Sequence, residues 1–532
     1  MRAVSGLLLV AIAATSMSLS TTALAAKAEH AYRLINEWRI EEADEEIATL
    51  LKARPHDPDV VFLDGNSKFL HGEYGRAVER LREAAAKERG GELGEEVRGL
   101  RDLAIATEEA TRGFVSYTKP GAHFIVQYAP GKDAVLGPYA LAALEKAFKA
   151  IGDDFGDVPK EPVRVEIFPE VADLAKVSTL TLKEIETSGT IALCKFNRLM
   201  IVSPRALLAG YPWLDTLTHE YTHFIVSRAS HNTVPIWLHE GLAKFEERRW
   251  RSQRSDGTAG LTPTMEHLLA SGLARKHLIT FEQMHPSMAK LPSQEDTALA
   301  FAEVYMVIEY LAQQIGWEGI RKIIGQLRDG KSDAQAVAFA VGKPFDQFQK
   351  EWRSWLGARK LKTRPGIIPT ELKFKKGGKQ TEASEDDSGQ ITEERARKLA
   401  RLGGMLRGRH RLKAAAIEYE KAQTLVGPGN PQVANKLART YLELGDPERA
   451  IKTAEPALEL YPDQAGPNAT LGEGWLKRGD YTKAETYLQA AVAINPFDPA
   501  LHCGLAQIYK LRSNAEARAA EEEHACRVLG GE

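Results

Sequence analysis

Five consecutive residues in the middle of the chain, 219–223, have the types and spacing of a metal-dependent hydrolytic site. His219 and His223 are four residues apart, so in a helix both imidazoles lie on one face and can bind one ion. Glu220 lies about 100° around that helix, where its carboxylate can act on a metal-bound water without being a ligand. Glu240 supplies a third ligand. Two histidines, a glutamate and one open position predict one Zn²⁺ per chain and hydrolysis by metal-activated water.

The residues around this site predict two mostly buried helices. Leu217 precedes the first histidine and an apolar run at 224–226 follows the second, within a helix expected from Leu214 to Arg228. Pro235 begins the helix that carries Glu240, and proline suits the first turn of a helix. Imidazoles and carboxylates in such an apolar setting are costly unless an ion compensates them.

The C-terminal third repeats with a period of 34 residues. Four residue types keep this register: Tyr441, Trp475 and Tyr509; Leu437, Leu471 and Leu505; Ala416, Ala450 and Ala484; Pro428, Pro462 and Pro496. The period resembles the tetratricopeptide repeat, in which Gly445 and Gly479 would cap the first helix of a repeat. The resemblance predicts an all-α array that binds partner proteins.

A weaker form of this period is present near the N-terminus, where Ala43 and Ala77 are also 34 residues apart. We predict two or three similar repeats there, and the alternative is a plain helical hairpin. Before them, an apolar run from Leu7 to Ala14 and the ending Ala23-Leu24-Ala25 are typical of a secretory signal peptide. Ala26, not a cysteine, follows the expected cleavage site, so we expect no lipid anchor.

The central part mixes strands and helices. Strands are predicted at 123–128, 163–168 and 199–202, and helices at 139–151, 299–315, 317–327 and 345–356. A basic run at 373–379 and an acidic run at 382–390 predict a disordered linker. The chain thus divides into a signal peptide (1–25), N-terminal repeats (28–112), a central domain (116–362), the linker (363–392) and C-terminal repeats (393–530).

Composition excludes several classes of function. The 70 basic and 72 acidic residues are well mixed and give a net charge of −2, so no surface for nucleic acid is expected. After the signal peptide no segment reaches about 18 apolar residues, so we expect no transmembrane segment and a periplasmic protein.

The sequence has three cysteines. Cys503 and Cys526 can pair across neighbouring helices, but with Cys194 we expect three free, buried thiols.

The pentapeptide, followed after 16 residues by the glutamate of the segment 237–247, resembles the gluzincin metallopeptidases. The likeness is greatest to peptidase MA-like metallohydrolases joined to tetratricopeptide repeats. It implies that His219, His223 and Glu240 are zinc ligands, that Glu220 is the general base, and that the substrate is a peptide. It also implies that the strand at 199–202 is the edge strand that holds the peptide. The expected fold class is an α+β zincin-like metallopeptidase domain between two all-α tetratricopeptide-repeat arrays.

Two parts of such a site are open in this sequence. Lys244 stands where thermolysin-like enzymes carry an acid that orients a histidine, and Glu246 and Glu247 are nearby alternatives. The expected oxyanion donor is Tyr305, although Phe301 stands where related sequences often have a tyrosine.

Other polar residues near the motif are alternatives for these roles. Tyr310 and His231 are alternative oxyanion donors, whereas His239 adjoins Glu240 in sequence but points away from it in a helix.

The sequence supports two functions. One is an exported zinc metallopeptidase whose repeats recruit substrate or partner proteins. The other is a repeat scaffold with a catalytically degenerate or structural zinc domain.

Overall fold

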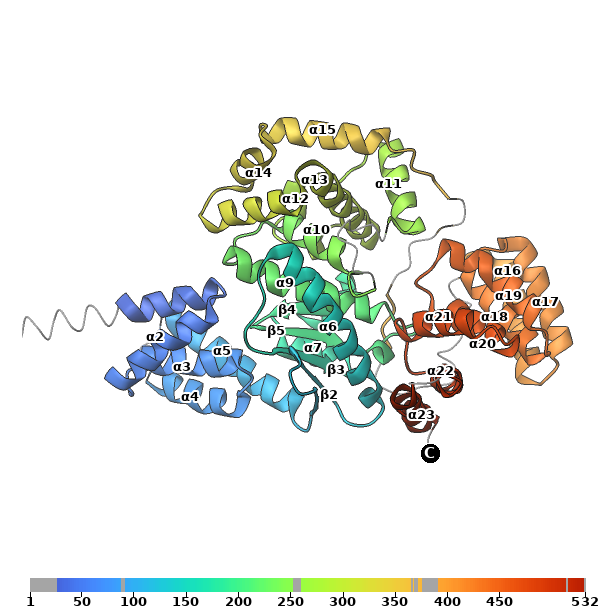
Figure 1. Ribbon diagram of the computed structural model, residues 1–532, viewed down its shortest axis with the longest axis horizontal. Helices are drawn as coiled ribbons and strands as arrows, with labels where there is room; N and C mark the ends of the chain where they lie inside the picture. The colour runs from blue at the N-terminus through green and yellow to red at the C-terminus, as the bar shows by residue number, and fades with distance from the viewer. Residues whose placement is uncertain are drawn as a thin grey trace, which may run out of the picture.

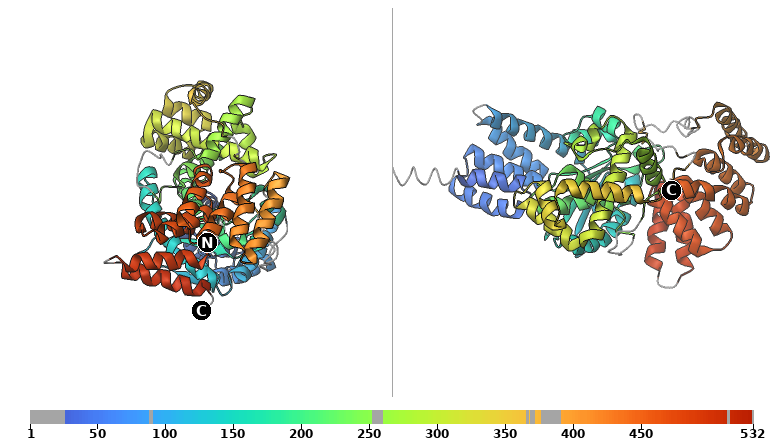
Figure 2. Two further views of the ribbon diagram at one scale, coloured as in Figure 1. Left: turned by 90° about the vertical axis from the view of Figure 1, so that its right-hand side faces the viewer. Right: turned by 90° about the horizontal axis from the view of Figure 1, so that it is seen from above.

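Residues 26–87, 91–251, 260–364, 367, 372–375, 391–512 and 515–530 are described in a computed structural model of the protein (Figure 1). The expected signal peptide lies outside these residues. N-terminal helices, a central α+β domain and C-terminal helices follow one another along the chain. The two helical parts lie at opposite ends of the molecule with the central domain between them, both in Figure 1 and in the view from above in Figure 2.

The described N-terminal part is entirely helical up to residue 111. A helix at residues 26–36 is followed by α2 (Ile40–Ala53), α3 (Pro58–Leu70), α4 (Tyr74–Ala86) and α5 (Glu92–Thr111). Ala43 and Ala77, the alanines of the weak 34-residue period, are fully buried. Small side chains at these positions let neighbouring helices approach closely.

The central domain contains a five-stranded mixed sheet. Its strands are β1 (Val115–Tyr117), β2 (Phe124–Tyr128), β3 (Val163–Phe168), β4 (Ala192–Lys195) and β5 (Arg198–Val202), in the spatial order β1-β2-β3-β5-β4. β2, β3 and β5 are parallel neighbours, whereas β1 and β4 pair antiparallel at the two edges. All five residues of β5 are buried, as expected for a strand whose two faces are both covered by helices.

The predicted edge strand is therefore wrong. Residues 199–202 belong to the interior strand β5, and β4 lies outside them at the edge. The turn between the two strands has Phe196 and Asn197 at φ values of 56° and 57°. A two-residue hairpin turn needs positive φ at both positions, a role that Asn-Gly or Asp-Gly usually fills. Phe-Asn carries no such signal, so the sequence did not indicate a hairpin here.

Helices surround the sheet and form the upper half of the domain in Figure 1. They are α6 (Leu136–Phe155), α7 (Val171–Val177), α8 (Leu182–Ser188), α9 (Trp213–Ser230), α10 (Ile236–Glu246), α11 (Pro263–Arg275), α12 (Phe281–Met284), α13 (Gln294–Arg328), α14 (Asp333–Val341) and α15 (Phe345–Ala358). Short 3₁₀ turns occur at η1 (Lys132–Val135), η2 (Pro204–Ala206) and η3 (Met288–Lys290). Gly316, at φ 61°, breaks α13 at the boundary predicted between two helices.

The N-terminal helices are joined to the sheet by a buried ion pair. Nε of Arg198 in β5 lies 3.2 Å from Oε2 of Glu166 in β3, and both side chains are 0 % exposed. Tyr74 of α4 donates its hydroxyl hydrogen to Glu166 and accepts one from Arg198. Arg164 donates to the carbonyl of Leu70 at the end of α3. Removing one partner of such a pair leaves a buried charge uncompensated, so the contact fixes the N-terminal helices to the domain.

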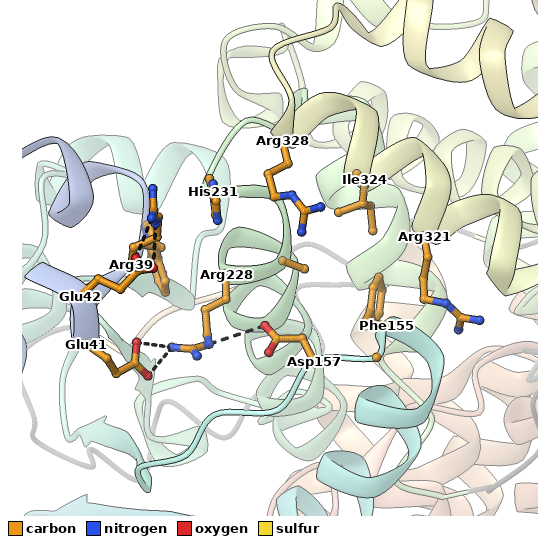
Figure 3. A pocket seen from close by; sticks show the side chains of 14 residues that line it. Arg39, Glu41, Glu42, Phe155, Asp157, Arg228, His231, Arg321, Ile324 and Arg328 are labelled. Atoms are coloured by element: carbon orange, nitrogen blue, oxygen red, sulfur yellow. Dashed lines mark hydrogen bonds and ion pairs between the residues drawn. The ribbon is translucent and has the colours of Figure 1, made fainter.

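A second contact joins α2 to the end of α9, as Figure 3 shows. Arg228 donates to Glu41 at 3.0 Å and lies 3.7 Å from the Asp157 carboxylate. Arg39 forms its own pair with Glu42. These ion pairs border a cavity of about 420 Å³ between α2, α9 and α13.

The C-terminal helices form the predicted tetratricopeptide array. They are α16 (Glu394–Gly408), α17 (Leu412–Val426), α18 (Pro431–Glu443), α19 (Pro447–Leu460), α20 (Ala465–Lys477), α21 (Tyr481–Val492), α22 (Pro499–Lys510) and α23 (Glu516–Gly530). Gly445 and Gly479 have φ values of 78° and 79° just after α18 and α20, as expected for helix-ending glycines. Ala450 and Ala484 of the repeat are fully buried.

Cys503 and Cys526 form a disulfide between α22 and α23, with their Cα atoms 5.2 Å apart. The expectation of free thiols is therefore wrong for this pair, because the two helices pack side by side and bring the cysteines within bonding range. Cys194 is a free thiol.

The linker is only partly described. Residues 372–375 lie against η2, where the N–H of Leu208 donates to the carbonyl of Lys373 and the N–H of Lys375 donates to Ala206. Disorder is therefore the wrong prediction for these four residues, and 376–390 lie outside the described residues. Within the described ranges, no helix is both long and apolar enough to cross a membrane.

Glu303 in α13 is a buried carboxyl at the centre of the helical half of the domain. Its Oε1 accepts the backbone N–H of Ile279 at 2.8 Å, and Oε2 has no hydrogen-bond partner among the described residues. Burial raises the pKa of Glu303 from 4.5 to about 8, against the weaker opposing effects of the Ile279 N–H and Arg353. The folded protein therefore keeps this carboxyl neutral at pH 7.

Replacing Glu303 by glutamine should make stability less dependent on pH. Between pH 4.5 and about 8 the unfolded chain ionises at Glu303 while the folded chain does not, so this group lowers the free energy of unfolding as pH rises. Glutamine cannot ionise. The stability of Glu303→Gln relative to the parent should rise by at least ~1 kcal/mol between pH 4.5 and pH 8, as measured by urea unfolding. A constant difference would contradict the buried neutral carboxyl.

Candidate metal centre

His219 and His223 of α9 and Glu240 of α10 converge on one point. Oε2 of Glu240 lies 3.4 Å from Nε2 of each histidine. One ligand atom from each of the three residues lies within 4.8 Å of the other two. Among the described residues this is the one such group of potential metal ligands.

The two separations between the histidine nitrogens and the Glu240 oxygen fit a tetrahedral ion. Bonds of about 2.0–2.1 Å to nitrogen and oxygen place neighbouring ligand atoms about 3.4 Å apart at the corners of a tetrahedron. Both histidine–glutamate separations have this value. Two imidazoles and one carboxylate are donors that suit Zn²⁺ and leave one corner free. The residues present therefore fit the zinc ion that the sequence predicts.

Glycine sets the position of α10. An added Cβ at Gly241 would lie 2.9 Å from Cγ1 of Ile308 and 3.1 Å from the carbonyl of Val304, both in α13. Only glycine therefore allows α10 to approach α13 this closely directly after Glu240. Trp237 and Leu238, one turn earlier in α10, are also buried in the core.

Glu220 lies beside the ligands and beside the edge strand. Its side chain is buried, and burial together with the nearby Glu240 raises the pKa of Glu220 to about 7, against the opposing effects of His223 and the backbone N–H of Cys194. Cys194 is in β4, so this strand passes next to the carboxylate. For Glu240, burial acts to raise the pKa, but the two imidazoles hold it well below its usual range. The two carboxylates thus have different proton affinities within one site.

Glu247 is the acid next to His219. Its Oε2 lies 3.9 Å from Nδ1 of His219, on the side of the ring opposite Glu240. Lys244 binds both oxygens of Glu247, at 2.7 and 2.8 Å. Lys244 therefore neither pairs with Glu240 nor points freely to solvent, and it holds the carboxylate that faces the histidine. The acid that the sequence left open lies one turn further along the chain than in thermolysin-like enzymes.

His239 supports the other histidine. Its ring lies 4.3 Å from the ring of His223, and its Nε2 lies 3.3 Å from the hydroxyl of Ser227. Burial and the charge of His223 lower the pKa of His239 to about 3, so it is neutral at pH 7. It is outside the group of converging ligand atoms, as predicted from its place on the helix.

The candidate oxyanion donors of α13 have different surroundings. The α13 ring in contact with His219 is that of Phe301, with ring centroids 6.2 Å apart. Tyr305 lies one turn further along α13 on the same face, 4 % exposed, with its ring 5.4 Å from Phe245. Tyr310 instead packs against Phe348 and Trp355.

His231 ends α9 and lines the cavity of Figure 3, eight residues or about 12 Å of helix from His223. This distance separates it from the reacting centre.

Comparisons with known protein families match two parts of the chain. A family model described as the Peptidase MA superfamily matches residues 143–358, and a tetratricopeptide-repeat model matches residues 435–499 and 469–527. The chain therefore carries a Peptidase MA superfamily domain followed by tetratricopeptide repeats, and the resemblance found in the sequence is confirmed. No curated protein matches the sequence.

Several solved structures show a weak local likeness to this chain. The tetratricopeptide-repeat protein TTC0263 of Thermus thermophilus is 24% identical, over 26% of this chain and 75% of its own, with a TM-score of 0.23. MamA of Desulfovibrio magneticus is 18% identical, over 26% and 76%, with a TM-score of 0.23. Native leukotriene A4 hydrolase of Saccharomyces cerevisiae is 12% identical, over 79% and 67%, with a TM-score of 0.29. Scores this low establish neither the fold nor the function of this chain.

Proposed function

We propose that this protein is an exported zinc metallopeptidase of zincin-like fold that hydrolyses peptide bonds. The observation that carries the proposal is the convergence of His219, His223 and Glu240, with the glutamate 3.4 Å from both histidines, beside the buried carboxylate of Glu220. A bound Zn²⁺ would polarise the scissile carbonyl and make water acidic enough to deprotonate near neutral pH. The Cys503–Cys526 disulfide supports an oxidising compartment, which agrees with the expected signal peptide and periplasm.

Residues of the chain would carry out proton transfer, substrate binding and stabilisation of the oxyanion. Glu220 accepts a proton from the attacking water and later gives it to the leaving amine. The edge strand β4 offers backbone groups beside Glu220, where an extended peptide can add as a further strand. Tyr305 is our proposed donor to the oxygen that becomes negative as the carbonyl is attacked. The helical repeats on both sides recruit substrate or partner proteins, and we assign α2–α5 as tetratricopeptide-like.

The phenylalanine at position 301 favours a second candidate function, without catalysis. The α13 side chain in contact with His219 has no hydrogen-bond donor, which favours a repeat scaffold with a structural zinc domain. Zinc-loaded protein that cleaves no member of a peptide library would support this alternative.

Glu240→Ala and Glu220→Gln should separate metal binding from chemistry. Residues 26–532 should contain about one zinc per chain, and Glu240→Ala should lose it because only two ligands remain. Glu220→Gln should keep the zinc and lose about 10²–10⁴-fold in kcat, because an amide cannot accept the proton. Metal analysis and a peptide-library assay measure both. Full activity in Glu220→Gln would contradict the assigned base, and zinc-free parent protein would contradict the site.

Glu247→Gln should weaken zinc binding about 10–100-fold, because outer residues that orient ligand histidines have effects of this size. Competition with a fluorescent chelator measures the affinity. The matched control is Glu246→Gln, since Glu246 faces Arg249 and Asp154 and its pKa is raised by burial, so that an amide resembles its neutral form. Equal zinc affinities of the two variants would contradict the assignment of Glu247 as the residue that orients His219.

Tyr305→Phe should retain zinc and lose about 10²–10³-fold in kcat, the range found when one oxyanion donor is removed. Tyr310→Phe is the matched control, because Tyr310 lies on the same helix as Tyr305 but packs against Phe348 and Trp355 of α15. This variant should keep full kcat. Unchanged kcat in Tyr305→Phe would assign the donor to another group.

A further inference from the structure

A cavity of about 540 Å³ lies between the N-terminal helices and the turn that joins β4 to β5. The helix at 26–36, α3 and α5 form one side of it, and Lys195, Phe196 and Asn197 form the other. Apolar side chains such as Leu70, Leu100 and Phe196 alternate with asparagine carboxamides, among them Asn66 and Asn197. Each carboxamide offers both a donor and an acceptor, which is what an extended peptide group requires.

Two aromatic residues beside this cavity, Trp38 and Phe196, have backbone conformations that are rare for their type. Among the described residues, seven that are not glycine have positive φ: Trp38, Phe196, Asn197, His231, Asn232, Lys276 and His410. Four of them, Trp38, Phe196, Asn197 and Asn232, line the cavity. Positive φ is rare for aromatic residues, and such strained residues cluster where a protein binds ligands. The concentration of strain at one cavity therefore points to a binding function.

The cavity borders the end of the strand that passes beside the candidate active site. The backbone N–H of Cys194 acts on the carboxylate of Glu220, and the next three residues of the chain line the cavity. Two residues of β-strand span about 7 Å. A peptide that adds to β4 with its scissile bond near Glu220 therefore extends into the cavity within two to four residues.

The direction of the strand decides which part of the peptide enters. β4 runs from Ala192 to Lys195, toward the cavity. Antiparallel pairing is the more stable arrangement of two strands. In that arrangement the part of the peptide that precedes the scissile bond lies toward Lys195.

We propose that this cavity is a specificity subsite built jointly by the N-terminal helices and the catalytic domain. It takes a bulky apolar side chain of the substrate polypeptide, located two to four residues before the scissile bond. The carboxamides hold the peptide backbone, and the apolar wall receives the side chain. This inference rests on the proposed peptidase function, and it assigns the N-terminal helices a part in substrate selection.

Gly99 provides a variant that fills the cavity without disturbing the fold. It lies in α5 on the cavity wall, and an added Cβ meets no atom within 4 Å. Gly99→Trp therefore places an indole in open space, and tryptophan is a better helix former than glycine. Gly75→Trp is the matched control, because Gly75 lies in α4, is outside the cavity lining and also has nothing within 4 Å of an added Cβ. Circular dichroism and zinc content establish that both variants are folded.

The experiment compares peptides that differ only in leucine or glycine at each of the second to fourth positions before the cleaved bond. The parent and Gly75→Trp should prefer leucine at one of these positions by at least about tenfold in kcat/KM, as burial of one leucine side chain predicts. Gly99→Trp should reduce this ratio to below about threefold. A ratio unchanged in Gly99→Trp, or a preference confined to positions after the bond, would overturn the subsite.

Binding separates this inference from the proposed function. The same peptides, labelled for fluorescence anisotropy, are titrated into Glu220→Gln with and without Gly99→Trp. A leucine preference in Kd that Gly99→Trp abolishes supports the subsite even where no peptide is cleaved, which would count against the peptidase alone. Equal Kd values for leucine and glycine peptides in Glu220→Gln would overturn the subsite whatever the activity of the parent.

Discussion

The structure depends on one constraint: two imidazoles and two carboxylates must be held in an apolar interior at fixed positions on α9 and α10. Left without compensation, such groups disfavour burial. Here Glu240 lies within 3.4 Å of both histidines, and Glu247 faces the far side of His219. The core therefore has to fix the two helices closely enough for the imidazoles and the Glu240 carboxylate to meet, and the contact of Gly241 with α13 is part of that requirement.

Both helical arrays contribute to the position of α9. At its start, the Trp213 indole donates to the carbonyl of Val492 at 3.0 Å, and the N–H of Tyr211 donates to Ile494, both in the C-terminal array. At its end, Arg228 pairs with Glu41, and Trp38 packs edge-on against Phe224. The helix that carries the histidines is thus held at one end by each array, so the arrays are structural neighbours of the site as well as candidate binding surfaces.

The sequence predicted the parts of the molecule that follow from local periodicity. The helix of the histidines, the strand segments at β3 and β5, and the 34-residue repeat each have a pattern that one segment carries by itself. Relations between distant segments were not predictable in this way. Glu247 meets His219 only because α10 returns along α9, and Cys503 meets Cys526 only because α22 and α23 pack together.

The missed edge strand has the same cause and a further consequence. Phe196 adopts positive φ at a cost of about 1–2 kcal/mol, whereas Asn197 tolerates it, so the hairpin is not favoured by its own sequence. Contacts with the N-terminal helices, which lie outside the central domain, stabilise this hairpin. Phe196 packs against Phe69 of α3, and Arg198, next in the chain after the turn, is paired beneath Tyr74 of α4. Because β4 leads into this turn and passes beside Glu220, the N-terminal helices stabilise the strand on which a substrate would lie. A central domain separated from them would lose both the proposed subsite and the contacts that hold its edge strand in place.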